Sequence, residues 1–190
     1  MRIVLASASP RRRELLGVMG VTDFEIIPAT GEEPDYGELP PEERVAQIAL
    51  AKARSVAAGL EGDCLVIGAD TLVFMDGKAL GKPHSGSEAE AMLEMLSGRD
   101  HTVATGVAVI RGGKELCETE LTRVRFARLR SEEIKAYVAT GESMDKAGAY
   151  GIQGRGSVLV EGIEGDYFNV MGLPIRRLYS MLGQFGLNIL

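Results

Sequence analysis

The first sixteen residues constrain the fold of this chain more than any other segment. An apolar strand at 2–6 runs directly into Ser7 and Ser9, and Pro10 with three following arginines then opens a helix expected over 11–18. Proline suits the first turn of a helix, but three arginines there oppose the helix dipole. Helix N-termini and guanidinium groups both bind phosphate well. The pattern therefore favours a strand-to-helix turn that binds a polyphosphate over a merely solvated basic turn.

Beyond that turn, the chain alternates between helix and strand patterns. Further strands are expected at 24–27, 64–69, 72–75, 78–80, 101–110, 114–128, 157–161 and 167–170. Further helices are expected at about 40–58, 87–96, 131–140 and 174–184. A capping-box pattern at Ser87 opens the helix at 87–96, and Asp76-Gly77 predicts a hairpin turn. This order indicates a mixed-sheet α/β fold in one domain over residues 1–190.

The charge balance restricts the partners of the chain. Its formal net charge is −6, with 45% hydrophobic residues, which is ordinary for a globular chain with a full core. An acidic protein is a poor binder of nucleic acid or of anionic membranes. The arginines at 11–13 are then a local positive site, as a small anionic ligand requires.

Cysteine usage and hydropathy point to a cytoplasmic protein. Cys64 and Cys117 both fall in expected strands and have no zinc-ligand spacing, so we expect reduced thiols. No apolar run approaches the ~20 residues of a membrane helix. An N-terminal strand that starts by residue 3 leaves no room for a signal peptide.

Asp70 is the strongest single candidate for chemistry. It directly follows the apolar strand at 64–69, and open α/β sheets bind ligands where their strands end. A carboxylate there binds a metal, takes a proton from water, or merely caps a turn together with Thr71. Position alone leaves these alternatives open.

Lys52 gives an independent clue from the helix at 40–58. The apolar stripe of that helix contains Val45, Ile48, Ala49 and Val56, and Lys52 falls on the same face. Its stem is therefore expected to point inward. The ammonium group then either reaches back to water or projects into an anion pocket.

Two loops add further charged groups. Glu32-Glu33 follows the strand at 24–27 and, if it faces Asp70, completes an oxygen-rich site suited to Mg²⁺ or Mn²⁺. Otherwise these paired acids are simply solvated. Gly81-Lys82-Pro83 supplies another cation just after the hairpin, in what is otherwise an ordinary surface turn.

The segment 146–156 is rich in glycine and contains Gln153. Glycine allows close approach of a ligand to the backbone, and a carboxamide can both donate to and accept from a nucleobase edge. The segment has neither the Walker A pattern nor a dinucleotide-binding fingerprint. His84 and His101 show no triad or metal spacing, so covalent acyl chemistry is not expected.

Taken together, these blocks resemble the Maf family of nucleoside triphosphate pyrophosphatases, and the match covers nearly the whole chain. The blocks are Ser7-Ala8-Ser9-Pro10-Arg11-Arg12, Glu32-Glu33, Lys52, Gly68-Ala69-Asp70-Thr71, Gly81-Lys82-Pro83, Asp145 to Gly154, and Ile163 to Pro174. The resemblance implies a Maf/inosine-triphosphatase-like fold, an elongated mixed sheet flanked by helices with a cleft between two lobes.

The resemblance also implies a reaction that needs a divalent metal and converts a nucleoside triphosphate and water into the monophosphate and pyrophosphate. Arg11, Thr71 and Gln153 resemble the subgroup that acts on dTTP and UTP. The same chemistry on 7-methyl-GTP or on modified pyrimidine nucleotides is the nearer alternative. A non-enzymatic nucleotide-binding regulator of septum formation is the farther one. Family members are associated with cell-division arrest and nucleotide house-cleaning and are often homodimers.

Site roles follow from the resemblance and the residue chemistry together. Asp70 is expected to be catalytic and, with Glu33, to bind Mg²⁺ or Mn²⁺. The expected substrate-binding residues are Ser7, Ser9, Arg11, Arg12, Lys52, Thr71, Lys82 and Gln153. Arg12 and Arg13 are about 100° apart on a helix, so only one of them is expected to face the site.

Overall fold

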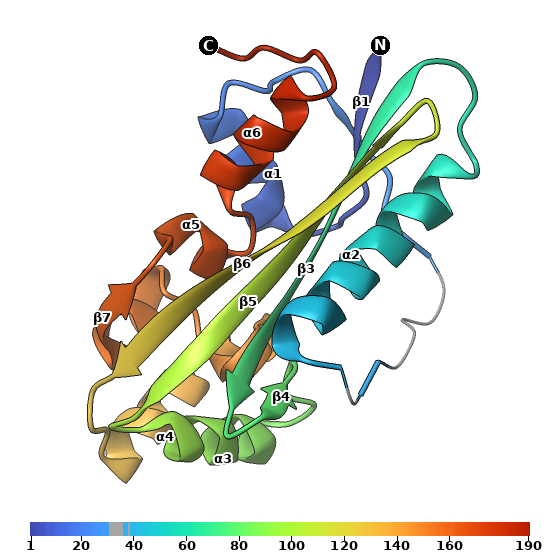
Figure 1. Ribbon diagram of the computed structural model, residues 1–190. Coiled ribbons are helices and arrows are strands. Elements are labelled where there is room, and N and C mark those ends of the chain that lie inside the picture. The colour runs from blue at the N-terminus through green and yellow to red at the C-terminus, as the bar shows by residue number, and fades with distance from the viewer. Residues whose placement is uncertain (31–35, 38) are drawn as a thin grey trace. The chain divides into compact units, whose positions relative to one another are not determined.

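The structure is a computed structural model that describes residues 1–30, 36–37 and 39–190. Its strands are β1 Arg2–Leu5, β2 Glu25–Ile26, β3 Cys64–Met75, β4 Lys78–Leu80, β5 Asp100–Arg111, β6 Lys114–Phe126 and β7 Val160–Glu164. Its α-helices are α1 Pro10–Val18, α2 Pro41–Ala57, α3 Gly86–Leu96, α4 Ser131–Val138, α5 Tyr167–Met171 and α6 Ile175–Gly183. Short 3₁₀ turns follow α4 at η1 Glu142–Asp145, η2 Ala147–Ala149 and η3 Gly154–Leu159. Figure 1 shows this order along the chain.

The strands of the described residues form one mixed sheet in the order β2-β1-β3-β5-β6-β7, with β4 paired to β3. The β1 strand is parallel to both β2 and β3, whereas β4 and β7 pair antiparallel with β3 and β6. Parallel neighbours need a crossover connection, and the helices α1 and α2 lie within these two connections. The expected mixed-sheet α/β fold is confirmed.

The chain divides into two compact units. Unit 1 comprises residues 1–70, 105–120 and 172–190, and unit 2 comprises residues 71–104 and 121–171. The long strands β3, β5 and β6 contribute residues to both. The expectation of one domain over residues 1–190 stays a prediction.

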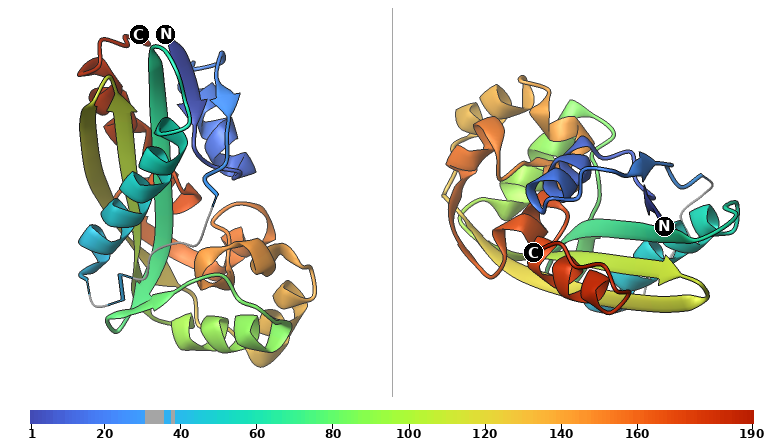
Figure 2. Two further views of the ribbon diagram at one scale, coloured as in Figure 1. Left: turned by 90° about the vertical axis from the view of Figure 1, so that its right-hand side faces the viewer. Right: turned by 90° about the horizontal axis from the view of Figure 1, so that it is seen from above.

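In unit 1, the helix α2 packs against the strands of the sheet. Its buried face is the apolar stripe expected from the sequence, and Ala49, Ala53 and Val56 belong to one core cluster with Val4 of β1 and Val66 of β3. Figure 2 shows α1 and β2 beside β1. Leu15 and Leu16 are the buried side chains of α1.

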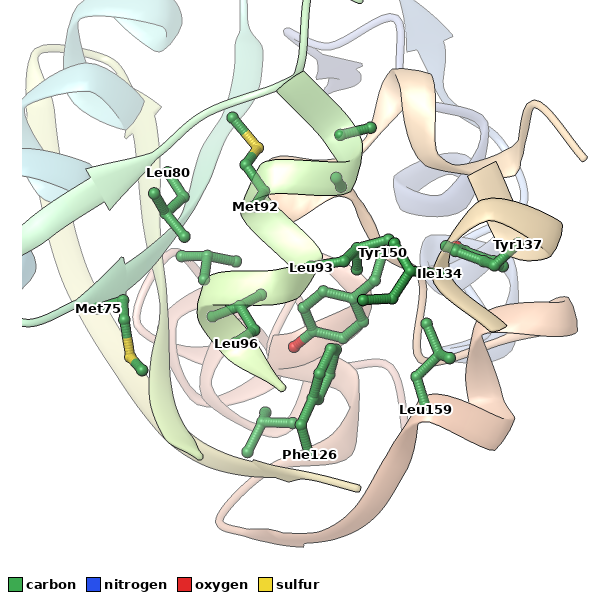
Figure 3. Close-up of a cluster of buried hydrophobic side chains, with 14 of the residues drawn as sticks. Met75, Leu80, Met92, Leu93, Leu96, Phe126, Ile134, Tyr137, Tyr150 and Leu159 are labelled. Carbon is green, nitrogen blue, oxygen red and sulfur yellow. The ribbon is translucent and has the colours of Figure 1, made fainter. Parts of the chain in front are cut away.

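In unit 2, a second core gathers side chains from strands, helices and turns. Figure 3 shows Met75 and Leu80 from the hairpin strands, Leu93 and Leu96 from α3, and Ile134 from α4. Phe126, Tyr150 and His101 meet edge-to-face, with ring centroids 4.6 Å apart for the Phe126–Tyr150 pair. The cluster anchors the glycine-rich segment through Tyr150.

The predicted hairpin is confirmed at Asp76-Gly77. Their φ angles are 51° and 76°, and Met75 pairs with Lys78 across the turn. Two-residue hairpin turns of this type need positive φ at both positions, which the Asp-Gly pair tolerates.

Four local expectations were wrong. The strand expected at 157–161 is displaced, because residues 154–159 form the 3₁₀ turn η3 and β7 covers Val160–Glu164. Asp70 does not follow the end of a strand, because β3 continues unbroken through it to Met75. Residues 167–170 form the helix α5 and not a strand, since Asp166 Oδ1 accepts the backbone N–H of Phe168 at 2.8 Å. The cap of α3 is Ser85, two residues before the Ser87 expected, and its hydroxyl accepts the N–H of Glu88 at 3.2 Å.

Among the residues that the structure describes, no helix combines the length and the apolar character needed to cross a bilayer.

Candidate active site

The turn between β1 and α1 belongs to unit 1 and has the geometry expected from the sequence. Ser7 is buried just after β1, and its hydroxyl accepts the N–H of Ser9 at 3.2 Å. Ser9 holds the N-cap position of α1, and Pro10 occupies the first turn. The N–H groups of this first turn and the helix dipole favour an anion.

Arg12 is the arginine that turns inward from this helix. Its Nη1 donates to Ser7 Oγ at 3.1 Å, and its Nε donates to the carbonyl of Gly172 at 2.8 Å. Arg13 is exposed, whereas Arg11 is half-buried. Arg12 is therefore the one of these two neighbours that turns inward, and its facing the substrate stays a prediction.

A close ion pair joins α2 to β3 in the same unit. Lys52 Nζ lies 2.7 Å from Asp70 Oδ1, and the two side chains are only 18% and 9% exposed. Such a pair is strongly coupled because little water screens it. Lys52 therefore lies on the inward face of its helix, as its place in the apolar stripe predicts.

Gly68 explains how Lys52 comes within reach of Asp70. A Cβ at Gly68 would lie 2.5 Å from the carbonyl oxygen of Ala49 and 2.9 Å from the Cβ of Ala53, both in α2. Only a residue without a side chain permits that approach of helix to strand. Lys52 is next to Ala53 in the helix, and Asp70 is two residues beyond Gly68 in the strand.

The strand register places the basic turn and Asp70 at the same end of two parallel strands. Leu5 pairs with Ile67, and the N–H of Ala6 donates to the carbonyl of Ile67 at 2.8 Å. The β1 strand then ends and the chain turns toward α1, while β3 continues through Asp70. Asp70 thus lies just beyond the carboxyl end of the parallel pair, where sheets of this kind bind ligands.

Asp70 has a free oxygen suited to a cation. Its Oδ2 is buried and has no hydrogen-bond partner within the described part of the chain. A buried carboxylate oxygen without a donor fits a hard cation such as Mg²⁺ or Mn²⁺. Glu33, the second expected metal ligand, lies outside the described residues. Within residues 1–30, 36–37 and 39–190 no cluster of three or more His, Cys, Asp or Glu side chains forms a metal site.

The remaining expected site residues belong to unit 2. Thr71 continues β3 and is half-buried, and Lys82 is exposed. Gln153 is half-buried and precedes the turn η3 in an extended conformation. The N–H of Gly148 donates to the carbonyl of Gly81 at 3.0 Å, so the glycine-rich segment is bonded to the turn that carries Lys82.

Sequence reasoning missed the side chains that hold the glycine-rich segment. Tyr137 and Glu142 bond its backbone, and His101 Nε2 lies 2.8 Å from the Tyr150 hydroxyl. Burial lowers the pKa of His101 to about 4, so this ring is neutral at physiological pH. Of these residues only Tyr150 carries a sequence signal, because it lies within the glycine-rich run.

Comparison with known proteins adds a family and several relatives. The family model described as "Maf-like protein" matches residues 2–185. The dTTP/UTP pyrophosphatase of Moorella thermoacetica is 57% identical over 190 residues, which cover 99% of this chain and 97% of that protein. The dTTP/UTP pyrophosphatase of Symbiobacterium thermophilum is 52% identical, covering 97% of this chain and 94% of the relative. The dTTP/UTP pyrophosphatase of Pelotomaculum thermopropionicum is also 52% identical, and the match covers 99% of this chain and 98% of that protein.

Proposed function

The chain belongs to the Maf family, and we propose that it hydrolyses nucleoside triphosphates, preferring dTTP and UTP, to the monophosphate and pyrophosphate. The substrate preference is supported by the relatives named dTTP/UTP pyrophosphatase at 52–57% identity. The observation that carries the reaction is the buried Lys52–Asp70 pair at the sheet end that also bears the Ser7–Arg12 turn.

The phosphate chain is bound by cations and hydroxyl groups. Arg11 and Arg12 donate from the first turn of α1, together with the hydroxyls of Ser7 and Ser9, and Lys52 and Lys82 add ammonium groups. These donors neutralise the charge that develops on the departing pyrophosphate, which is the main contribution a protein makes to phosphoryl transfer. The inward turn of Arg12 onto Ser7 supports this assignment.

Asp70 acts on the attacking water. Its carboxylate takes a proton as the water oxygen forms a bond to the α-phosphorus, and the bond from that phosphorus to the bridging oxygen of the β-phosphate breaks. Pyrophosphate leaves with the electron pair of that bond. Lys52 holds Oδ1 and so keeps the carboxylate oriented.

A divalent cation completes the proposed chemistry. Asp70 and Glu33 would hold Mg²⁺ or Mn²⁺, and the cation supplies positive charge against the triphosphate when bound. The buried and unpartnered Oδ2 of Asp70 within the described residues supports one ligand of this site.

Gln153 and Thr71 are assigned to substrate selection. The carboxamide of Gln153 can donate to a carbonyl and accept from the imide N–H of uracil or thymine. Thr71 directly follows Asp70 and is, with Arg11 and Gln153, one of the residues that resemble the dTTP/UTP subgroup.

A cytoplasmic location and a homodimer complete the proposal. Cys64 and Cys117 are free thiols, and burial raises the pKa of Cys117 to about 11, so this thiol is unreactive and suits a reducing compartment. The dimer is supported by the family resemblance alone and is tested by light scattering coupled to size exclusion.

A nucleotide panel tests the function directly. The purified protein is incubated with canonical and modified triphosphates in Mg²⁺ or Mn²⁺, and pyrophosphate and orthophosphate are measured separately. We expect pyrophosphate in equal amount with the monophosphate, fastest from dTTP and UTP. Release of orthophosphate with a nucleoside diphosphate would contradict cleavage between the α and β phosphorus atoms.

A further inference from the structure

The segment Gly151–Gly156, which carries Gln153, is held on both sides by two side chains. On one side, the N–H of Gly151 donates to the Tyr137 hydroxyl at 3.1 Å. On the other, the N–H groups of Arg155 and Gly156 each donate to the Glu142 carboxylate at 2.9 Å. Gln153 therefore lies between two fixed points of the backbone.

Glu142 and Tyr137 are themselves joined. The Tyr137 hydroxyl donates to Glu142 Oε1 at 3.1 Å, so the hydroxyl accepts from one end of the segment and donates to the group that holds the other end. Burial alone would raise the pKa of Glu142, but the bonds from Gly156, Arg155 and Tyr137, together with the charge of Lys146, outweigh it and the pKa is lowered. The carboxylate therefore accepts these bonds in its charged form, which strengthens them.

The same geometry brings the two ends of the segment together. A Cβ at Gly156 would lie 2.3 Å from the carbonyl oxygen of Gly151 and 2.8 Å from the Tyr137 hydroxyl. The chain thus folds back on itself around Gln153. We call Tyr137 and Glu142, with the backbone groups that they bond, the 137/142 frame.

A carboxamide needs such a frame to discriminate between bases. Gln153 carries one acceptor oxygen and one amide group with two donors, and rotation about its last torsion exchanges them. In one orientation it fits the carbonyl and imide of uracil, and after rotation it fits the amine and ring nitrogen of cytosine. The choice between uracil and cytosine therefore depends on the groups that fix the backbone position of Gln153 and the distance to which the base can approach it.

We propose that Glu142, acting through Tyr137 and the backbone of residues 151–156, is a positioning residue that determines base specificity at Gln153. This inference rests on the proposed function, since it takes Gln153 to contact the base. Glu142 makes no contact with the substrate. Its effect is to hold the backbone from which Gln153 extends.

The first test compares Glu142→Gln with a matched control, Glu133→Gln. Glu133 also lies in unit 2 and also accepts a backbone N–H, from Arg130 at 2.8 Å at the start of α4. The amide of Glu142→Gln presents a donor to an N–H that needs an acceptor, whereas Glu133→Gln leaves the frame intact. We expect Glu142→Gln to lower the UTP-to-CTP ratio of kcat/KM by at least about 5-fold and Glu133→Gln to leave it unchanged.

The kinetic constants separate positioning from general damage. Loss of base binding alone raises KM for UTP while kcat stays within about 2-fold, because the phosphate-binding groups are untouched. If kcat falls while the UTP-to-CTP ratio of kcat/KM stays unchanged in both Glu142→Gln and Glu133→Gln, Glu142 is merely structural and the inference is overturned.

A double-mutant cycle with Gln153→Ala tests whether Glu142 acts through Gln153. If it does, Glu142→Gln lowers the UTP-to-CTP ratio in the parent enzyme but changes it less than about 2-fold in the Gln153→Ala background. Equal effects in both backgrounds would overturn the inference. Tyr137→Phe removes the shared hydroxyl and serves as the second frame variant if Glu142→Gln does not fold.

A readout without activity keeps this inference distinct from the proposed function. Amide hydrogen exchange at Gly151 and Gly156 should speed up at least about 10-fold in Glu142→Gln and not in Glu133→Gln. Faster exchange with no UTP hydrolysis in the parent enzyme would mean that the proposed function has failed while the frame exists. Hydrolysis of UTP with a ratio unmoved by Glu142→Gln would mean that this inference has failed while the function stands.

Discussion

Lys52 donates to Asp70 Oδ1 at 2.7 Å from a helix to a strand, and this single bond connects the two groups that the sequence had marked separately. The ammonium neutralises a carboxylate that is 9% exposed, and it leaves Oδ2 without a donor in the described part of the chain. One oxygen is thus fixed while the other remains available for a cation or a proton. The pair accordingly combines structural and chemical roles, which mutations can separate.

Asp70→Asn tests the chemical role. The amide keeps the shape and can still accept from Lys52, but it has no charge for a cation and cannot act as a base at neutral pH. We expect kcat for UTP to fall by roughly 10²-fold or more, with an unchanged circular dichroism spectrum. Near wild-type pyrophosphate release by the folded variant would remove Asp70 from the mechanism.

Lys52→Met tests the coupling between the two groups. The thioether keeps the apolar stem, but Asp70 then has no counter-charge in a site that water barely reaches. We expect a lower free energy of unfolding in Lys52→Met and a coupling energy with Asp70→Asn of about 1 kcal/mol or more in a urea-denaturation cycle. We also expect a raised KM for UTP. Unchanged kinetics would mean that the ammonium does not meet phosphate.

Gly68→Ala tests the close approach of α2 to β3. The added methyl group would lie 2.5 Å from the carbonyl oxygen of Ala49, so the helix must shift away and the Lys52–Asp70 bond must lengthen. We expect a loss of about 1–3 kcal/mol in the free energy of unfolding together with a fall in kcat. Gly183→Ala in α6 is the control, because nothing lies within 4 Å of a Cβ there. Equal stability of the two variants would show that the approach at Gly68 is not tight.

His101 predicts a specific pH dependence of stability. Burial lowers its pKa from 6.5 to about 4, despite the opposing charge of Asp100. The unfolded chain therefore binds the proton more readily, so the neutral ring stabilises the fold above pH 6.5 and this contribution is lost as the pH falls toward 4. The loss is on the order of 3 kcal/mol. The free energy of unfolding, measured by urea denaturation at pH 7, 6 and 5, should fall more steeply with decreasing pH in the parent protein than in His101→Gln. Parallel falls in the two proteins would contradict this prediction.

Sequence patterns predicted the elements whose signals are local. The Asp76-Gly77 turn, the start of α2 at Pro41 and the buried stripe of α2 depend on neighbouring residues, and each appears where expected. Asp70 within β3 could not be predicted this way, because the continuation of the strand depends on β5, its neighbour in the sheet. The helix α5 was missed because its aromatic sequence favours a strand while the cap at Asp166 and the buried amide of Asn169 decide otherwise.

The sequence marked candidate site residues, and their roles stay predictions, but it could not predict the geometry that joins two of them. Inward placement of Lys52 followed from helix periodicity, yet its bond to Asp70 depends on the close approach at Gly68. Glu142 could not be found at all, because its bonds to the N–H groups of Arg155 and Gly156 join segments that no periodic pattern relates.

The last prediction concerns the base. Uracil and thymine share one hydrogen-bonding edge and differ by a methyl group, which is worth only about 1–3 kcal/mol in a pocket. Guanine adds a second ring and an amine, so a site that fits the pyrimidine leaves polar groups unpaired against it. We therefore expect UTP and dTTP to be good substrates and purine triphosphates poor ones. Gln153→Glu should impair both pyrimidines, because a carboxylate repels the carbonyl to which the amide donates. Competition assays with equimolar nucleotides measure the preference. Faster turnover of GTP or 7-methyl-GTP than of UTP would contradict the prediction. A Gln153→Glu enzyme that keeps the pyrimidine preference would contradict it as well.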